Sequence, residues 1–156
     1  MTIVEAVVKA NDERKAAMAE RVCRIVGTMK GATIAVLGLT FKPNTDDMRE
    51  SPSLVIVPRL VEAGARVQAY DPEGTDEARK LLEGIDFCSD SYAAIDGADA
   101  MVIVTEWNEF RALDLDRVRG LMKRPLVIDL RNIYSAADMG AAGFEYHGVG
   151  LGRAGS

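Results

Sequence analysis

Lys42 and Arg49 are two cations in a polar stretch that separates two apolar segments of the chain. Amide and hydroxyl side chains stand beside them, and this combination is typical of sites that bind phosphate or sugar oxygens. Three acids in the same stretch oppose the two cations, namely Asp46, Asp47 and Glu50. The residue types therefore predict an anionic ligand, and a solvated charge cluster in a long loop remains the alternative.

The elements on either side of this stretch would place it at the edge of a sheet. Residues 33–37 form a short apolar run rich in β-favouring types, and Gly38 ends it, which predicts a strand buried on both faces. Ser51 and Pro52 are typical of an N-cap and a first helical residue, so we expect a helix over residues 53–63. Open α/β sheets bind ligands beyond the carboxyl ends of their strands, and helix N-termini favour anions.

The order of residues in this stretch is more specific than its composition. The run from Gly38 to Pro52 reads GLTFKPNTDDMRESP. It resembles the segment that opens the C-terminal, UDP-binding domain of the UDP-glucose/GDP-mannose dehydrogenase family. The resemblance implies that Phe41 and Lys42 contact a nucleotide sugar and that Arg49 faces the cofactor NAD across a domain cleft.

Arg131 is a further candidate binding residue. It follows the run LVIDL over residues 126–130, which predicts a buried strand, so we expect it at the carboxyl edge of the sheet, where its guanidinium would hold an anionic oxygen bidentately. Asp129 and Arg131 resemble the family's Asp-x-Arg segment, whose arginine contacts the nucleotide sugar. Since Lys42 also follows a buried strand, we predict that Lys42 and Arg131 converge on one anionic ligand.

Apolar runs near residues 33, 66, 85, 100, 126 and 144 predict six strands, with helices between most of them over residues 75–83, 91–97, 113–122 and 136–141. Right-handed crossovers then give an α/β fold with a Rossmann-like, doubly wound and mostly parallel sheet. The segment from Thr105 to Phe110 resembles the family's Thr-Glu-Trp-x-x-Phe segment. We interpret Trp107 and Phe110 as an aromatic plug of the core, with a ligand wall as the alternative.

A long helix is predicted ahead of the first strand. Residues 2–10 are typical of a helix end, Asn11 of a new cap, and residues 12–29 of an amphipathic helix. The resemblance implies that this is the helix that links the family's central region to its C-terminal domain. We therefore expect a connecting helix region over residues 1–30, a nucleotide-sugar-binding domain over 31–150 and a mobile tail over 151–156. We also expect Val22 and Val26 on an exposed apolar face.

Composition narrows the classes of partner. The chain of 156 residues is 48% hydrophobic and 28% charged with a net charge of −5, which fits one globular domain and argues against binding to nucleic acid or a membrane surface. Neither a bilayer-spanning apolar run nor a secretory signal pattern is found, so a cytoplasmic location is expected. Cys23 and Cys88 are interpreted as small buried residues, and His147 as a structural residue.

The sequence does not carry the patterns that redox catalysis would need. The first strand is followed by GLTFKP in place of the GxGxxG pattern of dinucleotide folds. Neither cysteine stands in the family's Gly-Gly-Ser-Cys-Phe-Pro-Lys-Asp context. Asp71 is accordingly interpreted as a turn former or helix cap, with a ribose contact as the less favoured alternative. We expect no catalytic residue and no metal ligand in this chain.

The resemblance also implies an activity for the enzyme to which such a domain belongs. The family oxidises the 6-hydroxymethyl group of a nucleotide sugar to a carboxylate in two NAD-dependent hydride transfers, through a covalent thiohemiacetal. The implied partners are a UDP-sugar, the N-terminal and central dehydrogenase domains, which hold most of the NAD site, and a second copy in a homodimer. Residues 43–45 favour UDP-glucose over UDP-N-acetylmannosamine or GDP-mannose. The alternatives are a stand-alone nucleotide-sugar-binding or regulatory module and an unrelated α/β domain.

Overall fold

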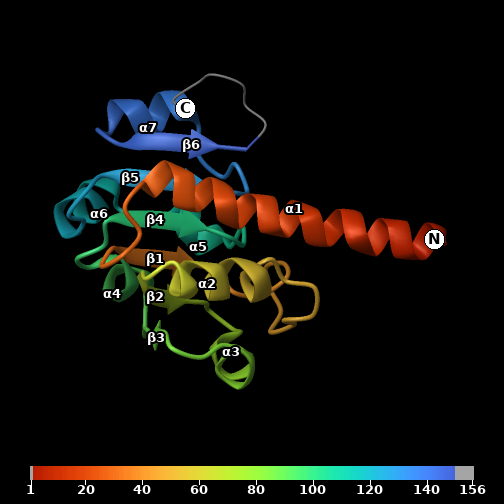
Figure 1. Ribbon diagram of the computed structural model, residues 1–156. Helices are drawn as coiled ribbons and strands as arrows, with labels where there is room; N and C mark the ends of the chain where they lie inside the picture. Colours follow the sequence, from red (N-terminus) through yellow and green to blue (C-terminus); the bar gives the residue numbers. More distant parts are fainter. Residues whose placement is uncertain (1, 150–156) are drawn as a thin grey trace.

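The computed structural model describes residues 2–149, which fold around one six-stranded sheet (Figure 1). Every strand pair is parallel, and the order across the sheet is β3-β2-β1-β4-β5-β6. This order confirms the predicted Rossmann-like, doubly wound fold. The predicted tail over residues 151–156 lies outside the described residues. The strands are β1 (Thr33–Leu37), β2 (Arg66–Tyr70), β3 (Asp86–Phe87), β4 (Ala100–Ile103), β5 (Leu126–Asp129) and β6 (Glu145–Gly148).

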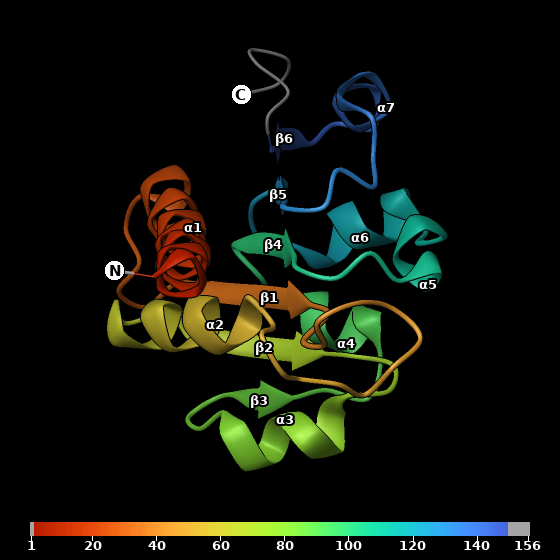
Figure 2. The ribbon, with the colours of Figure 1, turned by 90° about the vertical axis from the view of Figure 1, so that its right-hand side faces the viewer.

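Helices cover both faces of the sheet. Figure 2 shows α1 and α2 on one side of the sheet and α5, α6 and α7 on the other. Among the described helices, none is both long and apolar enough to cross a membrane. The helices are α1 (Ile3–Val26), α2 (Ser53–Glu62), α3 (Thr75–Leu81), α4 (Ser91–Ile95), α5 (Asn108–Arg111), α6 (Leu115–Leu121) and α7 (Ala136–Ala141).

The central strands are buried on both faces, as the apolar runs predict. In β1, Ile34 and Val36 pack into the cluster beneath α1 and α2, whereas Ala35 and Leu37 pack into the cluster beneath α4 to α7. Successive side chains of a strand point to opposite faces, so a strand between two helical layers needs apolar residues at every position. The buried sheet therefore fixes where each strand ends and where the polar loops begin.

The helix α1 is continuous, and the predicted break at Asn11 is wrong. Thr2 caps it, because its hydroxyl accepts from the Glu5 amide at 3.1 Å while the Glu5 carboxylate accepts from the Thr2 amide at 3.0 Å. Asn11 lies in the helix interior, where it costs only about 0.7 kcal/mol relative to alanine, too little to end a helix that lacks proline and glycine. Gly27, with a φ of 90°, ends it.

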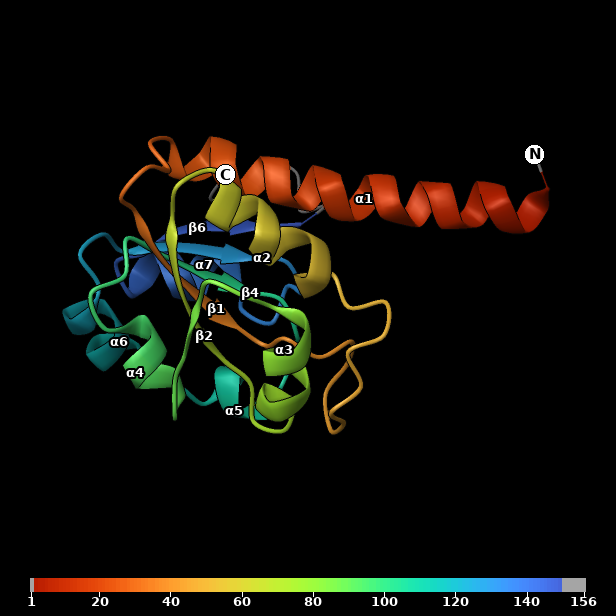
Figure 3. The same cartoon turned by 60° about the horizontal axis from the view of Figure 1, so that its bottom comes forward.

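The predicted exposed face of α1 also lies elsewhere on the helix. Val22 and Val26 are buried against the sheet together with Ala19. The exposed apolar residues are those of the N-terminal turns, which project beyond the rest of the fold (Figure 3): Ile3, Val4, Val7 and Val8. The amphipathic pattern identified the helix correctly, but it could not show which half packs on the sheet.

Two further element predictions need correction. The helix α2 begins at Ser53, as expected, but the N-cap position assigned to Ser51 is occupied by Pro52, whose backbone angles are helical. The Ser51 hydroxyl still accepts from the Ser53 amide at 3.2 Å. The short helix α5 was not predicted, since its pattern was read only as an aromatic segment. In that segment Trp107 and Phe110 are buried, as expected for a core plug.

Candidate functional site

The loop between β1 and α2, residues 38–52, lies beyond the carboxyl edge of the sheet and is anchored at both ends. At its far end the hydroxyls of Ser51 and Ser53 both donate to the Leu39 carbonyl, each at 2.6 Å. Near its start the Thr105 hydroxyl donates to the Thr40 carbonyl at 2.7 Å. These buried bonds close the loop on itself and tie it to the end of β4. The loop ends are therefore built into the core, and only the middle of the loop is exposed.

Asp71, at the end of β2, holds the first residues of the loop. The residue is 2% exposed, and its carboxylate accepts from the amides of Leu39 and Thr40 at 2.7 and 3.0 Å. It also accepts from the Gly74 amide at 2.7 Å and from the Trp107 indole at 3.3 Å. The structure thus confirms the interpretation of Asp71 as a turn former. Its oxygens are occupied by the protein, and this arrangement does not favour the alternative of a ribose contact.

Asp129 plays a similar part at the end of β5. Its buried carboxylate accepts from the amides of Arg131 and Tyr134 at 3.1 and 3.0 Å and from the Tyr146 hydroxyl at 2.8 Å. The tight turn that follows includes Asn132 in the left-handed region, with a φ of 54°. In the Asp-x-Arg pattern the aspartate therefore stabilises the turn, and the turn positions the arginine.

The guanidinium of Arg131 is held by Glu106, which follows β4. Its Nε and Nη2 donate to the same carboxylate oxygen, Oε2, at 2.6 and 2.5 Å. The side chains of Arg131 and Glu106 are 34% and 25% exposed, so the ion pair is partly buried at the edge of the sheet. Nη1 makes no hydrogen bond to the described residues. Sequence reasoning missed Glu106, although its place directly after an apolar strand was the same signal that identified Arg131.

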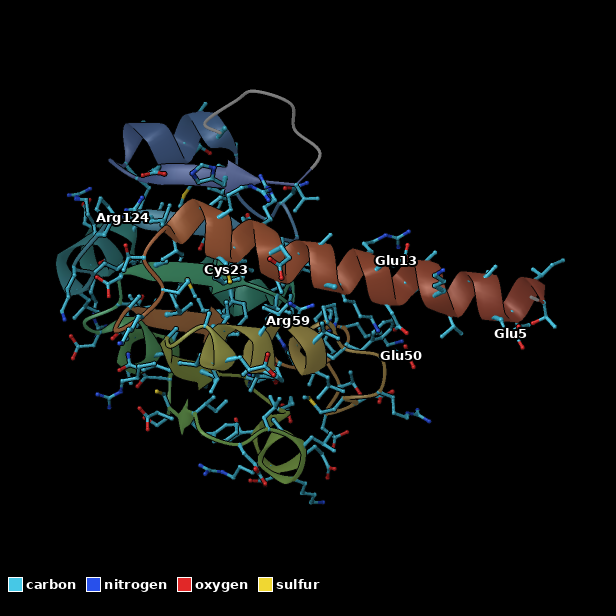
Figure 4. All side chains as sticks on the ribbon, in the orientation of Figure 1. Glu5, Glu13, Cys23, Glu50, Arg59 and Arg124 are labelled. Atoms are coloured by element: carbon cyan, nitrogen blue, oxygen red, sulfur yellow. The ribbon has the colours of Figure 1, made fainter. Side chains whose placement is uncertain are left out.

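Phe41 and Arg131 line one cavity of about 430 Å³ between α1 and the loop, hereafter the basic cavity. Phe41 is 45% exposed, which is unusual for a phenylalanine and leaves its ring available to a ligand. Figure 4 shows Glu50, another lining residue, on the loop beside α1. The full lining is Asn11, Arg14, Lys15, Met18, Phe41, Glu50, Pro52 and Arg131. Two of the predicted site residues therefore meet here, and α1 contributes residues that were not predicted.

Arg49 lies on the other side of the loop. Its side chain is 89% exposed, and Nε and Nη2 donate to the two oxygens of Asp47, each at 3.0 Å. The hydrogen bonds from Arg49 hold the pKa of Asp47 below its usual range. The cavity beside Arg49, of about 700 Å³, is rich in acids, with Asp46, Asp47 and Glu77 in its wall. Arg49 and Arg131 thus face different cavities.

Lys42 is exposed, and it lies on the same edge of the sheet as Arg131 because both follow parallel strands of one sheet. It does not line the basic cavity, although its neighbour Phe41 does. Its carbonyl accepts from the Thr40 hydroxyl at 3.1 Å, which fixes the backbone at this point. The shared ligand of Lys42 and Arg131 stays a prediction.

The two cysteines have none of the features of nucleophiles. Both are unpaired and partly buried, where small buried residues were expected. Burial raises the pKa of both thiols, with nearby carboxylates adding to the effect: Glu20 beside Cys23, and Asp86 beside Cys88. Within residues 2–149, no group of three or more histidine, cysteine, aspartate or glutamate side chains is placed to hold a metal ion.

Comparison with known proteins gives a consistent answer. Residues 35–136 match the model of the UDP-glucose/GDP-mannose dehydrogenase family, UDP binding domain. The chain is 56% identical to a UDP-glucose 6-dehydrogenase of Rhizobium meliloti and 42% identical to the UDP-glucose 6-dehydrogenase TuaD of Bacillus subtilis, over 95% of its length in both cases. It covers 34% and 32% of those proteins, so it spans about a third of the length of the curated relatives it matches.

Solved structures show the same relationship. A UDP-glucose dehydrogenase from Pyrobaculum islandicum superposes with a TM-score of 0.75 and 29% identity, covering 92% of this chain and 31% of that one. A UDP-D-ManNAc dehydrogenase from Pyrococcus horikoshii superposes with a TM-score of 0.68 and 30% identity, covering 88% of this chain and 31% of that one. The fold and the order of motifs therefore agree with one group of sugar-nucleotide dehydrogenases.

Proposed function

Because the chain belongs to the UDP-glucose/GDP-mannose dehydrogenase family, we propose that it is the nucleotide-sugar-binding domain of a UDP-glucose 6-dehydrogenase. The observation that carries this proposal is the basic cavity, where Phe41 and Arg131 meet although they follow different strands. An aromatic ring and a guanidinium are the groups that stack on a base and bind a diphosphate. In this reading UDP is the part of the substrate that the domain recognises.

Each predicted site residue has a distinct part in the proposal. The Phe41 ring packs against the uridine or the sugar, and Arg131 binds the diphosphate through the edge of its guanidinium that Glu106 leaves free. Lys42, exposed beside Phe41, donates to the sugar or phosphate oxygens. Arg49 meets NAD, which is bound mainly by another part of a full-length enzyme. These roles rest on the resemblance of the loop and on the positions of the side chains described above.

The chain does not fit NAD at the place where a doubly wound fold would bind it. The amides that follow β1, those of Leu39 and Thr40, already donate to Asp71 and so are not free to donate to a pyrophosphate. The thiols of Cys23 and Cys88 have raised pKa values, so neither suits covalent catalysis. The oxidation of UDP-glucose to UDP-glucuronate, with its two hydride transfers, is therefore assigned to the N-terminal and central domains of the full-length enzyme.

The domain boundaries form part of the same proposal. Residues 1–30 are the end of a connecting helix region, and residues 31–150 are the binding domain. The full-length enzyme would act in the cytoplasm as a homodimer, with the N-terminal and central dehydrogenase domains as partners of this domain.

A titration of the chain with UDP tests the proposal. Followed by amide chemical shifts, it should give saturable changes in the loop over residues 38–52 and in the turn after β5. Uridine should cause smaller changes, because it lacks the diphosphate. Absence of saturable shifts with UDP and with UDP-glucose would refute nucleotide-sugar binding by this chain.

A further inference from the structure

The basic cavity differs in charge from its surroundings. Three cations line it, Arg14, Lys15 and Arg131, against the single carboxylate of Glu50. The chain as a whole has a net charge of −5, and the cavity on the opposite side of the loop has three acids and one arginine in its wall. A concentration of positive charge on an acidic protein attracts anions, and the volume of about 430 Å³ falls within the range of small-molecule sites.

Two of these cations come from α1, outside the domain that the resemblance assigns to UDP. Asn11, Arg14, Lys15 and Met18 follow one another at helical spacing, so they share one face of α1. The next turns of the same helix pack on the sheet through Ala19, Val22 and Val26. Packing therefore fixes the direction in which this face points, and the face forms the wall opposite Phe41 and Arg131.

The charged groups of the cavity retain capacity for a ligand. The Lys15 side chain is 13% exposed and its ammonium donates to Glu50 at 3.1 Å, whereas the Glu50 side chain is 76% exposed. An ammonium has three donors, and this contact uses one of them. The guanidinium of Arg14 makes no hydrogen bond within the described residues, so its donors are unused. Glu50 also has a φ of 61°, an unusual conformation for a glutamate, which marks a backbone held by its surroundings.

We propose that α1 forms one wall of the nucleotide-sugar site: Arg14 and Lys15 bind the diphosphate opposite Arg131, and Glu50 is the counter-ion of Lys15 until the ligand arrives. This inference rests on the proposed function, since it names further residues of the same site. A diphosphate carries more charge than one carboxylate and reaches both side chains of the helix, so it replaces Glu50 at Lys15. The long helix is then part of the binding site as well as a connection.

The test compares variants of matched charge on the same helix. UDP is titrated by calorimetry into the wild-type chain, Arg14→Gln, Lys15→Gln and the control Arg24→Gln, which removes one exposed cation of α1 away from the cavity. Arg14→Gln and Lys15→Gln should each weaken binding about tenfold or more, and Arg24→Gln less than about twofold. Inorganic pyrophosphate should follow the same order. Uridine should not distinguish the variants.

Glu50→Gln separates a binding role from a structural one. If Glu50 competes with the diphosphate for Lys15, removal of its charge should raise the affinity for UDP by a few fold. If the Lys15 to Glu50 pair only fastens the loop to α1, the same change should lower the melting temperature without any gain in affinity, and the proposal fails.

The outcomes of the titration also separate this inference from the proposed function. A wild-type chain that binds UDP while Arg14→Gln and Lys15→Gln bind it as tightly as Arg24→Gln would overturn the role of α1 alone. A wild-type chain that binds neither UDP nor UDP-glucose would overturn the proposed function and this inference together.

Discussion

Arg131 presents one edge of its guanidinium to Glu106, since Nε and Nη2 both donate to the same carboxylate oxygen at 2.6 and 2.5 Å. A bidentate contact with a ligand then has to use the edge formed by Nη1 and Nη2. The pair therefore fixes both the orientation of the arginine and the direction from which a diphosphate can approach it.

Replacement of Arg131 by lysine should lower UDP affinity almost as much as replacement by alanine, by about tenfold or more. A lysine ammonium is a single point of charge, so it cannot hold Glu106 with one edge and a phosphate with another. Calorimetric titration of the two variants measures this. An affinity of Arg131→Lys within about twofold of wild type would contradict the argument. In the Arg131→Ala background, Glu106→Gln should recover part of the loss, because it removes an unpaired carboxylate from the site.

Gly38→Ala should unfold the domain or destabilise it by about 3 kcal/mol or more. Gly38 has a φ of 92°, and an added Cβ would lie 2.5 Å from Thr105 Cβ and 2.6 Å from the Thr105 amide nitrogen. Gly120→Ala is the matched control, because Gly120 lies in α6 with nothing within 4 Å of an added Cβ. That change should stabilise the fold by about 0.5–1 kcal/mol. Urea unfolding of both variants measures this difference in stability, and equal unfolding midpoints would refute the prediction.

Asp71→Asn should cost about 2–4 kcal/mol of unfolding free energy and should disturb the loop after β1. The asparagine amide would place an N–H group against amides that now donate to a carboxylate, such as those of Leu39 and Gly74. Asp76→Asn, in the exposed first turn of α3, is the control and should change stability by less than about 1 kcal/mol. Chemical denaturation measures the loss of stability, and amide chemical shifts report on the loop. Unchanged shifts over the loop would contradict the prediction.

The chain with UDP-glucose and NAD should produce no NADH, because it lacks a cysteine with the properties of a nucleophile. Cys23 and Cys88 have raised thiol pKa values, so at neutral pH each has a smaller thiolate fraction than a free cysteine.

Alkylation of the two thiols by iodoacetamide should therefore be slower than in a short cysteine peptide, and it should speed up as the pH rises. In urea both thiols should react as the peptide does. Fast alkylation of either cysteine in the folded chain would contradict the assignment.

Much of the fold could be predicted because buried strands require runs of apolar residues, which are visible in the sequence. The apolar runs that became β1, β4 and β5 are buried at nearly every position, and a parallel sheet between two helical layers requires this. Because the strands are parallel, the residues that follow these runs all lie at the carboxyl edge of the sheet. This is why Lys42 and Arg131 could be assigned to the same edge of the sheet.

The contacts between side chains of different elements could not be predicted, because they depend on distances that the periodicity of the sequence does not determine. The pairing of Glu106 with Arg131 needs the register of β4 against β5, in which Ile103 lies beside Asp129. The approach of Lys15 to Glu50 needs the angle at which α1 crosses the sheet. Asn11 was wrongly predicted to be a cap because asparagine is common at helix starts, although it is also tolerated at half-buried positions within a helix.

The anchoring of the loop by Asp71 has a consequence for the entropy of binding. The ends of the loop are held by buried bonds that form when the protein folds, and the Phe41 amide donates to the Asp47 carbonyl across the loop at 2.9 Å. A ligand that arrives at the basic cavity therefore meets a loop whose two ends are already ordered. The ordering of a flexible loop, which otherwise reduces affinity, is then a cost of folding and not of association. The domain should accordingly bind with little change in the backbone order of this loop.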